Sequence, residues 1–264
     1  MKITHDFHVH TTLSLCANET ATVDNYLAIA KRLGLKKMGF SDHFGKPDIS
    51  GARGFYRAHP LEHNLSLKPI VRERSTPELQ LYFGCETEYF PLHRDVAITE
   101  AEAEQFDFIT VPNSHTHMIM PKDYIGNYQK HVDFMIQAYE DTLNSPVSRY
   151  ITAMAHPFDA VCCPYDYKIL IRMISDDQFK RLFDKTAEKG IAVEINTSYT
   201  KGMTPQEIAD DVHIPMFLLA KECGCKFIFG SDAHDDQHHA CFANADLIAD
   251  LLSLHEEDLA EICR

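Results

Sequence analysis

The sequence predicts an α/β barrel, in which parallel strands alternate with helices and a functional site lies at one end. Short apolar runs of strand length alternate with helical patterns along the chain, and this alternation favours parallel pairing of the strands. Residues that can bind metals follow nearly every apolar run. In a parallel barrel these positions meet at the carboxyl ends of the strands, which is where such folds place their sites.

Seven apolar runs are the predicted strands. They lie near Ile3–Val9, Lys37–Phe40, Gln80–Cys85, Phe106–Val111, Ile151–Ala155, Ile191–Ile195 and Lys226–Phe229. The segments at their ends read, in order, "HVH", "SDH", "GCETE", "NSHTH", "AHP", "EINTS" and "GSDAH". Six of these seven ends carry residues suited to metal binding, and the sixth strand offers Glu194 and Asn196.

Helical patterns occupy the segments between the strands. The first is predicted to begin after Thr22, a residue type that caps helix N-termini, and to stop at Gly34. The segment from Ser175 to Gly190 repeats the same pattern of cap, apolar spacing and terminal glycine. Further helices are predicted at Tyr124–Leu143, Pro215–Cys223 and Ala243–Leu254.

The composition indicates one globular domain. The 264 residues are 45% hydrophobic and 24% charged, which is ordinary for a globular protein. No composition break, repeat or linker divides them, so we predict a single domain over residues 1–264 with a basic insert at 45–78. The sequence carries no signal for an oligomeric state.

The charge and the apolar runs exclude several classes of partner. A net charge of −14 disfavours binding to long nucleic acids. No apolar run approaches the roughly 20 residues that span a bilayer, and the first residues lack the apolar core of a signal peptide. The eight cysteines follow no secreted-domain pattern. We therefore expect a cytoplasmic protein without a membrane partner.

The histidines indicate a metal centre. Sixteen of them recur along the whole chain instead of clustering at one end. A single histidine after a strand is usually a capping or hydrogen-bonded residue, but recurrence at equivalent strand ends predicts a gathered set of ligands. Mixtures of imidazole and carboxylate suit divalent cations such as Zn, Mn and Fe.

Together these motifs resemble the PHP family, the polymerase and histidinol phosphatase domain. The segments "HVHTTLS", "SDH", "GCETE", "SH", "AHP" and "GSDAH" occur in the family's order, and "EINTS" is similar to the histidinol-phosphatase branch. The resemblance implies a distorted (β/α)7 barrel of TIM-like type. It also implies two or three divalent metal ions (Zn, Mn or Fe) and hydrolysis of phosphate esters.

The resemblance further implies which residues bind the metals. The implied ligands are His8, His10 and Asp232 for the first metal, Glu86 as a bridge to the second, His115 and His156 for the second, and His43 and His234 for a third. His117 is an alternative to His115. Cys16 stands where the family usually has a histidine, so its thiolate is either a third-metal ligand or a thiol beside a two-metal site.

These residue types suit phosphoester hydrolysis on physical grounds. A carboxylate such as Glu86 can span two ions about 3.5–4 Å apart, and a water between them is available as hydroxide near neutral pH. We predict that this metal-bridging hydroxide attacks phosphorus. Asp232 and His234 are the candidate catalytic residues that protonate the leaving group.

A basic insert is the candidate phosphate-binding element. The segment Gly45–Glu78 follows the "SDH" motif and is net basic in an acidic chain. It is either a lid, with Arg53 or Arg57 binding the phosphate through a fork-like contact, or an ordinary solvated loop. Asn196 is a further candidate for substrate binding.

Three functions compete at this point. The leading prediction is a metal-dependent phosphoesterase whose small phosphorylated substrate is histidinol phosphate or a phosphorylated sugar or nucleotide. An amidohydrolase that cleaves a C–N bond or a lactone uses a similar set of ligands on a barrel. A non-catalytic metal-binding module is the third hypothesis.

Overall fold

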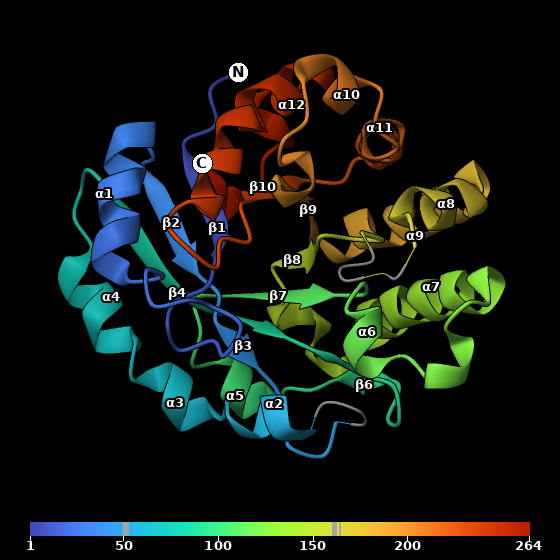
Figure 1. The fold of residues 1–264 in the computed structure, drawn as a ribbon, viewed down its shortest axis with the longest axis horizontal. Coiled ribbons are helices and arrows are strands. Elements are labelled where there is room, and N and C mark those ends of the chain that lie inside the picture. The colour runs from blue at the N-terminus through green and yellow to red at the C-terminus, as the bar shows by residue number, and fades with distance from the viewer. Residues whose placement is uncertain (50–52, 160–162, 164) are drawn as a thin grey trace.

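The computed structural model describes residues 1–49, 53–159, 163 and 165–264. Its central sheet confirms the predicted fold, because all seven strands are parallel neighbours in the order β1-β2-β4-β7-β8-β9-β10 (Figure 1). The strands are β1 (His5–Val9), β2 (Lys37–Phe40), β4 (Gln80–Thr87), β7 (Phe108–Pro112), β8 (Ala153–Ala155), β9 (Ala192–Asn196) and β10 (Phe227–Gly230).

Backbone hydrogen bonds join the two ends of this sheet. The Asp232 amide donates to the His8 carbonyl at 2.8 Å, and the His10 amide donates to the Ala233 carbonyl at 2.9 Å. The segment after β10 therefore lies beside β1, and the sheet is nearly closed into a barrel. This closure brings the first and last predicted motifs of the chain together.

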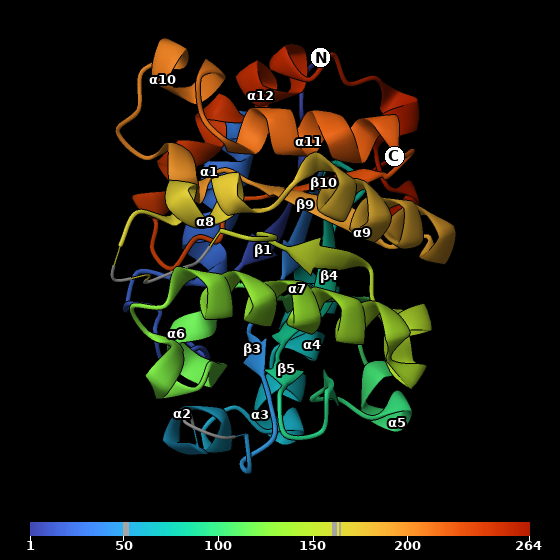
Figure 2. The same ribbon diagram turned by 90° about the vertical axis from the view of Figure 1, so that its right-hand side faces the viewer.

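Helices surround the barrel on its outside (Figures 1 and 2). The α-helices are α1 (Val23–Leu33), α2 (Arg53–Arg57), α3 (Leu61–Leu65), α4 (Lys68–Arg74), α5 (Glu100–Ala103), α6 (Thr116–Ile119), α7 (Tyr128–Asn144), α8 (Tyr167–Met173), α9 (Asp176–Lys189), α10 (Pro205–Ala209), α11 (His213–Glu222) and α12 (Ala245–Leu251). Short strands β3 (His43–Phe44), β5 (Tyr89–Phe90) and β6 (Asp95–Val96) complete the sheets. None of the described helices is both long and apolar enough to cross a bilayer.

The predicted helix signals act as expected. The Thr22 side chain accepts a hydrogen bond from the Asn25 amide, and Gly34 ends α1 with φ 72°. Ser175 forms a capping box at the start of α9, and Gly190 ends that helix with φ 68°. Only glycine adopts these positive φ values without strain, which is why both helices stop where the sequence indicates.

The described residues of the basic insert contain three helices, which differs from the solvated loop that was one of its two predicted alternatives. It forms α2, α3 and α4, and α4 packs its buried Val71 against the core. Several of its cations pair on the outer surface, where Arg72 contacts Asp107 at 2.5 Å. Apolar residues at helical spacing, such as Leu67 and Val71, are buried in the core, so folding this segment buries more apolar surface than a solvated loop would.

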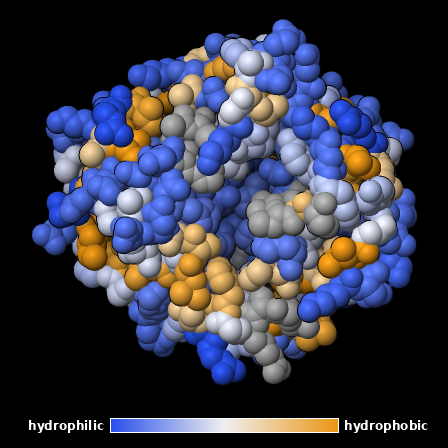
Figure 3. Space-filling view, viewed as in Figure 1, coloured by the Kyte–Doolittle hydropathy of each residue, from blue (hydrophilic) through white to orange (hydrophobic). Residues whose placement is uncertain are grey.

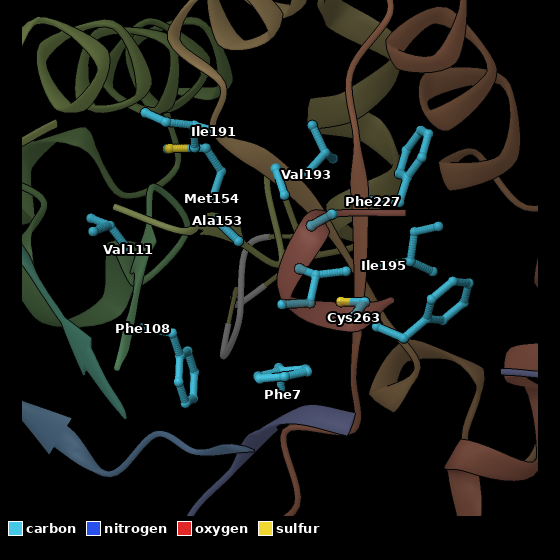
Figure 4. Close-up of a cluster of buried hydrophobic side chains, with 14 of the residues drawn as sticks. Phe7, Phe108, Val111, Ala153, Met154, Ile191, Val193, Ile195, Phe227 and Cys263 are labelled. Carbon is cyan, nitrogen blue, oxygen red and sulfur yellow. The ribbon is translucent and has the colours of Figure 1, made fainter. Parts of the chain in front are cut away.

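Two glycines make room for aromatic rings in the barrel core. Phe7 and Phe108 pack edge to face with ring centroids 5.2 Å apart (Figure 4). A β-carbon on Gly84 would lie 2.3 Å from Cε1 of Phe108, and one on Gly39 would lie 2.6 Å from both rings. The absence of these two side chains therefore allows the large rings to fill the barrel.

Replacing Gly84 by Ala tests this packing. The added methyl group forces the buried Phe108 ring to move, and overpacking of this kind costs about 1–3 kcal/mol. Chemical denaturation of wild type and G84A should show that loss in the free energy of unfolding. A Gly54→Ala variant controls for glycine replacement without a clash, because no atom lies within 4 Å of a β-carbon there and its φ is not positive. Equal stability of G84A and wild type would contradict the packing.

Candidate metal centre

The end of β1 places two histidines, His8 and His10, in the predicted site. The β1–β2 pairing shifts register between Asp6 and Val9, and such a bulge redirects side chains. Phe7 packs against Phe108 in the core, while the next residue, His8, points to the other face of the strand and contacts the carboxylates of the site. The Nε2 atoms of His8 and His10 lie 3.1 Å apart, a separation suited to two nitrogens that bind one cation at about 2.1 Å each.

The predicted ligands converge into three overlapping groups. In each group, three ligand atoms lie within 4.8 Å of one another. The groups are His8, His10 and Asp232; His8, Glu86 and His156; and His10, His43 and His234. The grouping brings together residues from β1, β3, β4 and the segments after β8 and β10, as the order of motifs predicted.

Glu86 lies at the centre of this cluster. Its Oε1 is 3.0 Å from Nε2 of His156, and its Oε2 is 3.0 Å from Nδ1 of His43. The Nε2 atoms of His8, His10 and His115 each lie 3.6 Å from one of its two oxygens. Burial alone would raise the pKa of Glu86, but the surrounding imidazoles, His115 and His8 foremost, hold it well below its ordinary value. The carboxylate is therefore ionised and faces imidazoles in several directions.

Asp232 has a similar electrostatic environment. Its Oδ1 lies 3.1 Å from Nε2 of His10 and 3.4 Å from Nε2 of His8. Burial opposes ionisation, but His8, His10 and His234 together hold the pKa of Asp232 well below its ordinary value. In turn, burial disfavours charge on His8, yet Glu194, Asp232 and Glu86 raise its pKa. A divalent cation would replace protons in this cluster.

Carboxylates fix the ring orientation of two histidines, His8 and His115. The Nδ1–H of His8 donates to Glu194, with distances of 2.9 and 3.0 Å to its two oxygens. The Nδ1–H of His115 donates to Glu88 at 2.8 Å. Each ring then presents Nε2, the nitrogen that lacks a proton in the neutral tautomer, to the cluster.

Serine hydroxyls contact the Nδ1 atoms of two further histidines, His10 and His156. Ser14 Oγ lies 3.2 Å from Nδ1 of His10 and donates to Asp42 at 2.7 Å, and Ser114 Oγ lies 2.6 Å from Nδ1 of His156. The sequence motifs contain these supporting residues, but their role was not predicted. Glu88 follows Glu86 by two residues and so lies on the same side of the strand end, which was the available signal.

Strained backbone accompanies two of the ligand candidates. His156 has φ 25° and Asp232 has φ 53°, values that non-glycine residues rarely adopt. Such strain persists where the surrounding structure imposes it, and it clusters at functional sites. Two hydrogen bonds hold these conformations. The Asp232 amide donates to the His8 carbonyl, and the His156 amide donates to the Glu194 carboxylate at 2.9 Å.

A large cavity opens beside the cluster. It measures about 870 Å³, and six of the predicted site residues line it: Cys16, His43, Glu86, His115, Asp232 and His234. Figure 3 shows the hollow near the centre of the barrel face, with hydrophilic residues inside it. His117, the alternative to His115, also lines the cavity. The cluster is therefore accessible to a small molecule.

Several predicted site residues lie apart from the three groups. Cys16 is exposed and lines the cavity, but it belongs to none of the groups. His115 faces Glu86 at 3.6 Å without joining a group. Asn196 is buried and donates to Glu194 at 3.1 Å, so it orients a supporting carboxylate and is not among the cavity residues.

One of the two predicted phosphate-binding arginines can be placed, and it does not line the cavity. Arg57 is exposed on α2 and does not line it, although its neighbours Phe55 and Tyr56 do. The side chain of Arg53 lies outside the described residues. His59, a histidine outside the quoted motifs, is fully buried directly after α2.

The fold and the cluster together define a parallel barrel protein with a His- and carboxylate-rich centre suited to divalent metals. The chain belongs to the PHP domain family, whose model matches residues 6–198. This match confirms the family indicated by the motifs.

Similar proteins carry consistent names. A protein of Shewanella loihica named "Probable phosphatase" is 24% identical over 234 residues, which cover 89% of this chain and 79% of that protein. A Shewanella piezotolerans protein of the same name is 23% identical over 239 residues, with the same coverage. These names agree with the predicted enzyme class, a phosphatase.

A solved structure shares the fold. Histidinol phosphate phosphatase from Lactococcus lactis, crystallised with zinc, L-histidinol and phosphate, superposes with a TM-score of 0.69 at 15% identity. The match covers 96% of this chain and 95% of that chain. At this level of identity the likeness supports the barrel architecture.

Proposed function

We propose that this PHP-domain protein is a metal-dependent phosphatase that hydrolyses a small phosphomonoester. The observation that carries the proposal is the convergence of seven His, Glu and Asp ligand candidates on one cluster beside an open cavity. The names of the Shewanella relatives support the same class of reaction.

The residues present fit divalent metal ions. The facing Nε2 atoms of His8 and His10 and the oxygens of Glu86 form a donor set of the kind that Zn, Mn and Fe prefer. The first metal would be held by His8, His10 and Asp232, and the others by the groups that contain His156 and His43. When bound, such ions polarise phosphoryl oxygens and activate water.

The chain's own residues orient the reacting groups. His234 donates its Nδ1–H to the Asp232 carbonyl at 2.8 Å, because a carbonyl oxygen can only accept. Its Nε2 is therefore the nitrogen that can bind a metal or exchange a proton. Asp232 and His234 both line the cavity, so either is placed to pass a proton to the leaving group.

Metal removal tests the proposal. Treatment with a strong chelator should abolish hydrolysis of p-nitrophenyl phosphate, and added Zn, Mn or Fe should restore it. Elemental analysis of the purified protein should find two or three ions per chain, as expected for the family. Retention of activity in metal-free protein would contradict the proposal.

Further assays on the same purified protein distinguish the phosphatase from the two competing functions. Amide and lactone substrates are assayed beside the phosphomonoester, since an amidohydrolase would prefer them. A stoichiometric metal content without turnover of any ester, amide or lactone would instead indicate a binding module. A screen that includes histidinol phosphate, sugar phosphates and nucleotides identifies the preferred substrate.

A further inference from the structure

The helical insert that follows β3 contacts the metal centre directly. Phe55 and Tyr56 on α2 line the cavity together with His43 and His115, and the rings of Phe55 and His43 meet edge to face with centroids 5.0 Å apart. Figures 1 and 2 both show α2 and α3 at the side of the barrel where β3 lies. The insert therefore forms part of the wall of the site through aromatic side chains, and not through Arg57.

Tyr56 connects this wall to a carboxylate that orients a ligand candidate. Its hydroxyl donates a hydrogen bond to Oε2 of Glu88, and the same oxygen accepts the Nδ1–H of His115 at 2.8 Å. Nε2 of His115 then faces Oε1 of Glu86 at 3.6 Å. The contacts thus run from the Tyr56 hydroxyl through one carboxylate to the His115 ring.

Burial makes this arrangement sensitive to the loss of one hydrogen bond. Tyr56 and Glu88 are each 1% exposed, so bulk water does not replace a missing donor. Burial and the adjacent Glu88 raise the pKa of Tyr56 well above its ordinary value, which keeps the proton on the hydroxyl that donates. A buried carboxylate is costly to leave without such a donor. Movement of Glu88 to find another partner would release the ring of His115.

A glycine provides the space for the Tyr56 ring. A β-carbon on Gly45 would lie 2.3 Å from Cδ1 of that ring. Gly45 directly follows β3, the short strand that carries His43. The ring of Tyr56 therefore packs against the backbone of a segment that carries a ligand candidate.

Two hydrogen bonds hold the insert against the same segments. Nε2 of His59 accepts from the Leu15 amide at 3.0 Å, and the Asn64 side chain donates to the His43 carbonyl at 3.0 Å. Both His59 and Asn64 are buried. They connect the insert to the loop after β1 and to β3, so Tyr56 has a defined position relative to the cluster.

We propose that Tyr56 is a positioning residue through which the insert holds His115 in the metal centre. Its hydroxyl holds Glu88, and Glu88 in turn fixes the tautomer and the direction of the His115 ring. The inference deepens the proposed phosphatase function and rests on it, because it concerns the metal centre which that reaction requires. It gives the insert a role in metal binding, which differs from the phosphate binding expected from its charge.

Tyr56→Phe tests the inference, because it removes the hydroxyl and keeps the ring. Zinc titration of the metal-free protein should show one binding step weakened about tenfold, the lower value for loss of a group that supports a metal ligand. The other binding steps should match wild type. Wild-type zinc affinity at every step of Y56F would overturn the inference.

Tyr139→Phe is the matched control. It also removes the hydroxyl of a fully buried tyrosine, which lies 2.9 Å from Oγ1 of Thr186, and it should bind zinc as wild type does. Thermal unfolding of the metal-free variants shows whether each is folded. Equal weakening of zinc binding in Y56F and Y139F would overturn the inference, because the affinity would then follow the stability of the fold.

A double-mutant cycle tests the route through Glu88. In protein that carries Glu88→Ala, the further change Tyr56→Phe should leave the zinc affinity unchanged, because the residue on which Tyr56 acts is already absent. A second tenfold loss in this background would overturn the inference. If E88A does not fold, the titrations of Y56F and Y139F decide the inference on their own.

Rates of hydrolysis separate this inference from the proposed function. At limiting zinc, Y56F should hydrolyse p-nitrophenyl phosphate more slowly than wild type, and excess zinc should restore its kcat/KM. A loss that persists when every metal site is filled would place the role of Tyr56 at the substrate and overturn the inference alone. Failure of fully loaded wild type to hydrolyse any phosphomonoester would overturn the phosphatase function, whereas the zinc titrations would still decide the role of Tyr56.

Discussion

Replacement of Glu86 by Gln is expected to lower kcat/KM for a phosphomonoester by more than about 100-fold, the upper value for loss of a residue that only orients a metal ligand. The reason is the position of Glu86, whose oxygens lie 3.0 Å from His156 and His43. An amide keeps the shape but removes the negative charge that balances cations in this cluster. Steady-state kinetics and elemental analysis of the variant measure both consequences.

Two matched variants show whether the effect belongs to the cluster. Glu88→Gln changes a carboxylate that orients His115, so its loss should be smaller, about 10–100-fold. Glu78→Gln changes an exposed residue and should behave as wild type. A Glu86→Gln variant with normal metal content and rate would show that the metals, or the reaction, lie elsewhere.

The sequence was sufficient to predict the strands and the residues at their ends. Each strand is a short apolar run, and the ligand candidates stand at or shortly after the carboxyl ends of these strands. Local pattern and parallel pairing therefore predict the meeting of His8, Glu86 and Asp232. Their convergence needs no knowledge of side-chain geometry, because the carboxyl ends of parallel strands share one end of a barrel.

Other features depend on contacts between distant parts of the chain. Asn196 stands at a strand end like the ligand candidates, yet it donates to Glu194, and only the three-dimensional structure distinguishes these two uses. The basic insert was read by its charge, but its apolar residues at helical spacing decide its structure. The role of Gly230 is a third case, because its importance lies in two residues more than 30 positions away.

At Gly230 a single added methyl group is expected to disturb the metal cluster through Glu194 and His8. A β-carbon there would lie 2.1 Å from Oε1 of Glu194 and 2.5 Å from Cβ of His8. Glu194 can rotate away, but that movement breaks its hydrogen bonds to the His8 ring. The His8 Cβ is attached to the backbone of β1, so relief of the second contact requires the strands themselves to separate.

Gly230→Ala should therefore reduce both stability and metal binding. Overpacking of this kind costs about 1–3 kcal/mol in the free energy of unfolding, and loss of the carboxylate that orients His8 weakens metal affinity about 10–100-fold. Denaturation and metal titration measure the two effects. The stability loss alone does not identify the cause, because overpacking anywhere in the barrel produces it.

Gly84→Ala supplies the comparison that identifies it. Both variants add one methyl group to a barrel strand, but the contacts at Gly84 are with Phe108 and those at Gly230 are with Glu194 and His8. If the two variants lose similar stability and only G230A loses metal affinity, the effect is transmitted through the Glu194–His8 hydrogen bond. If G84A weakens metal binding equally, the cluster depends on the packing of the whole barrel, and Glu194 has no special part in it.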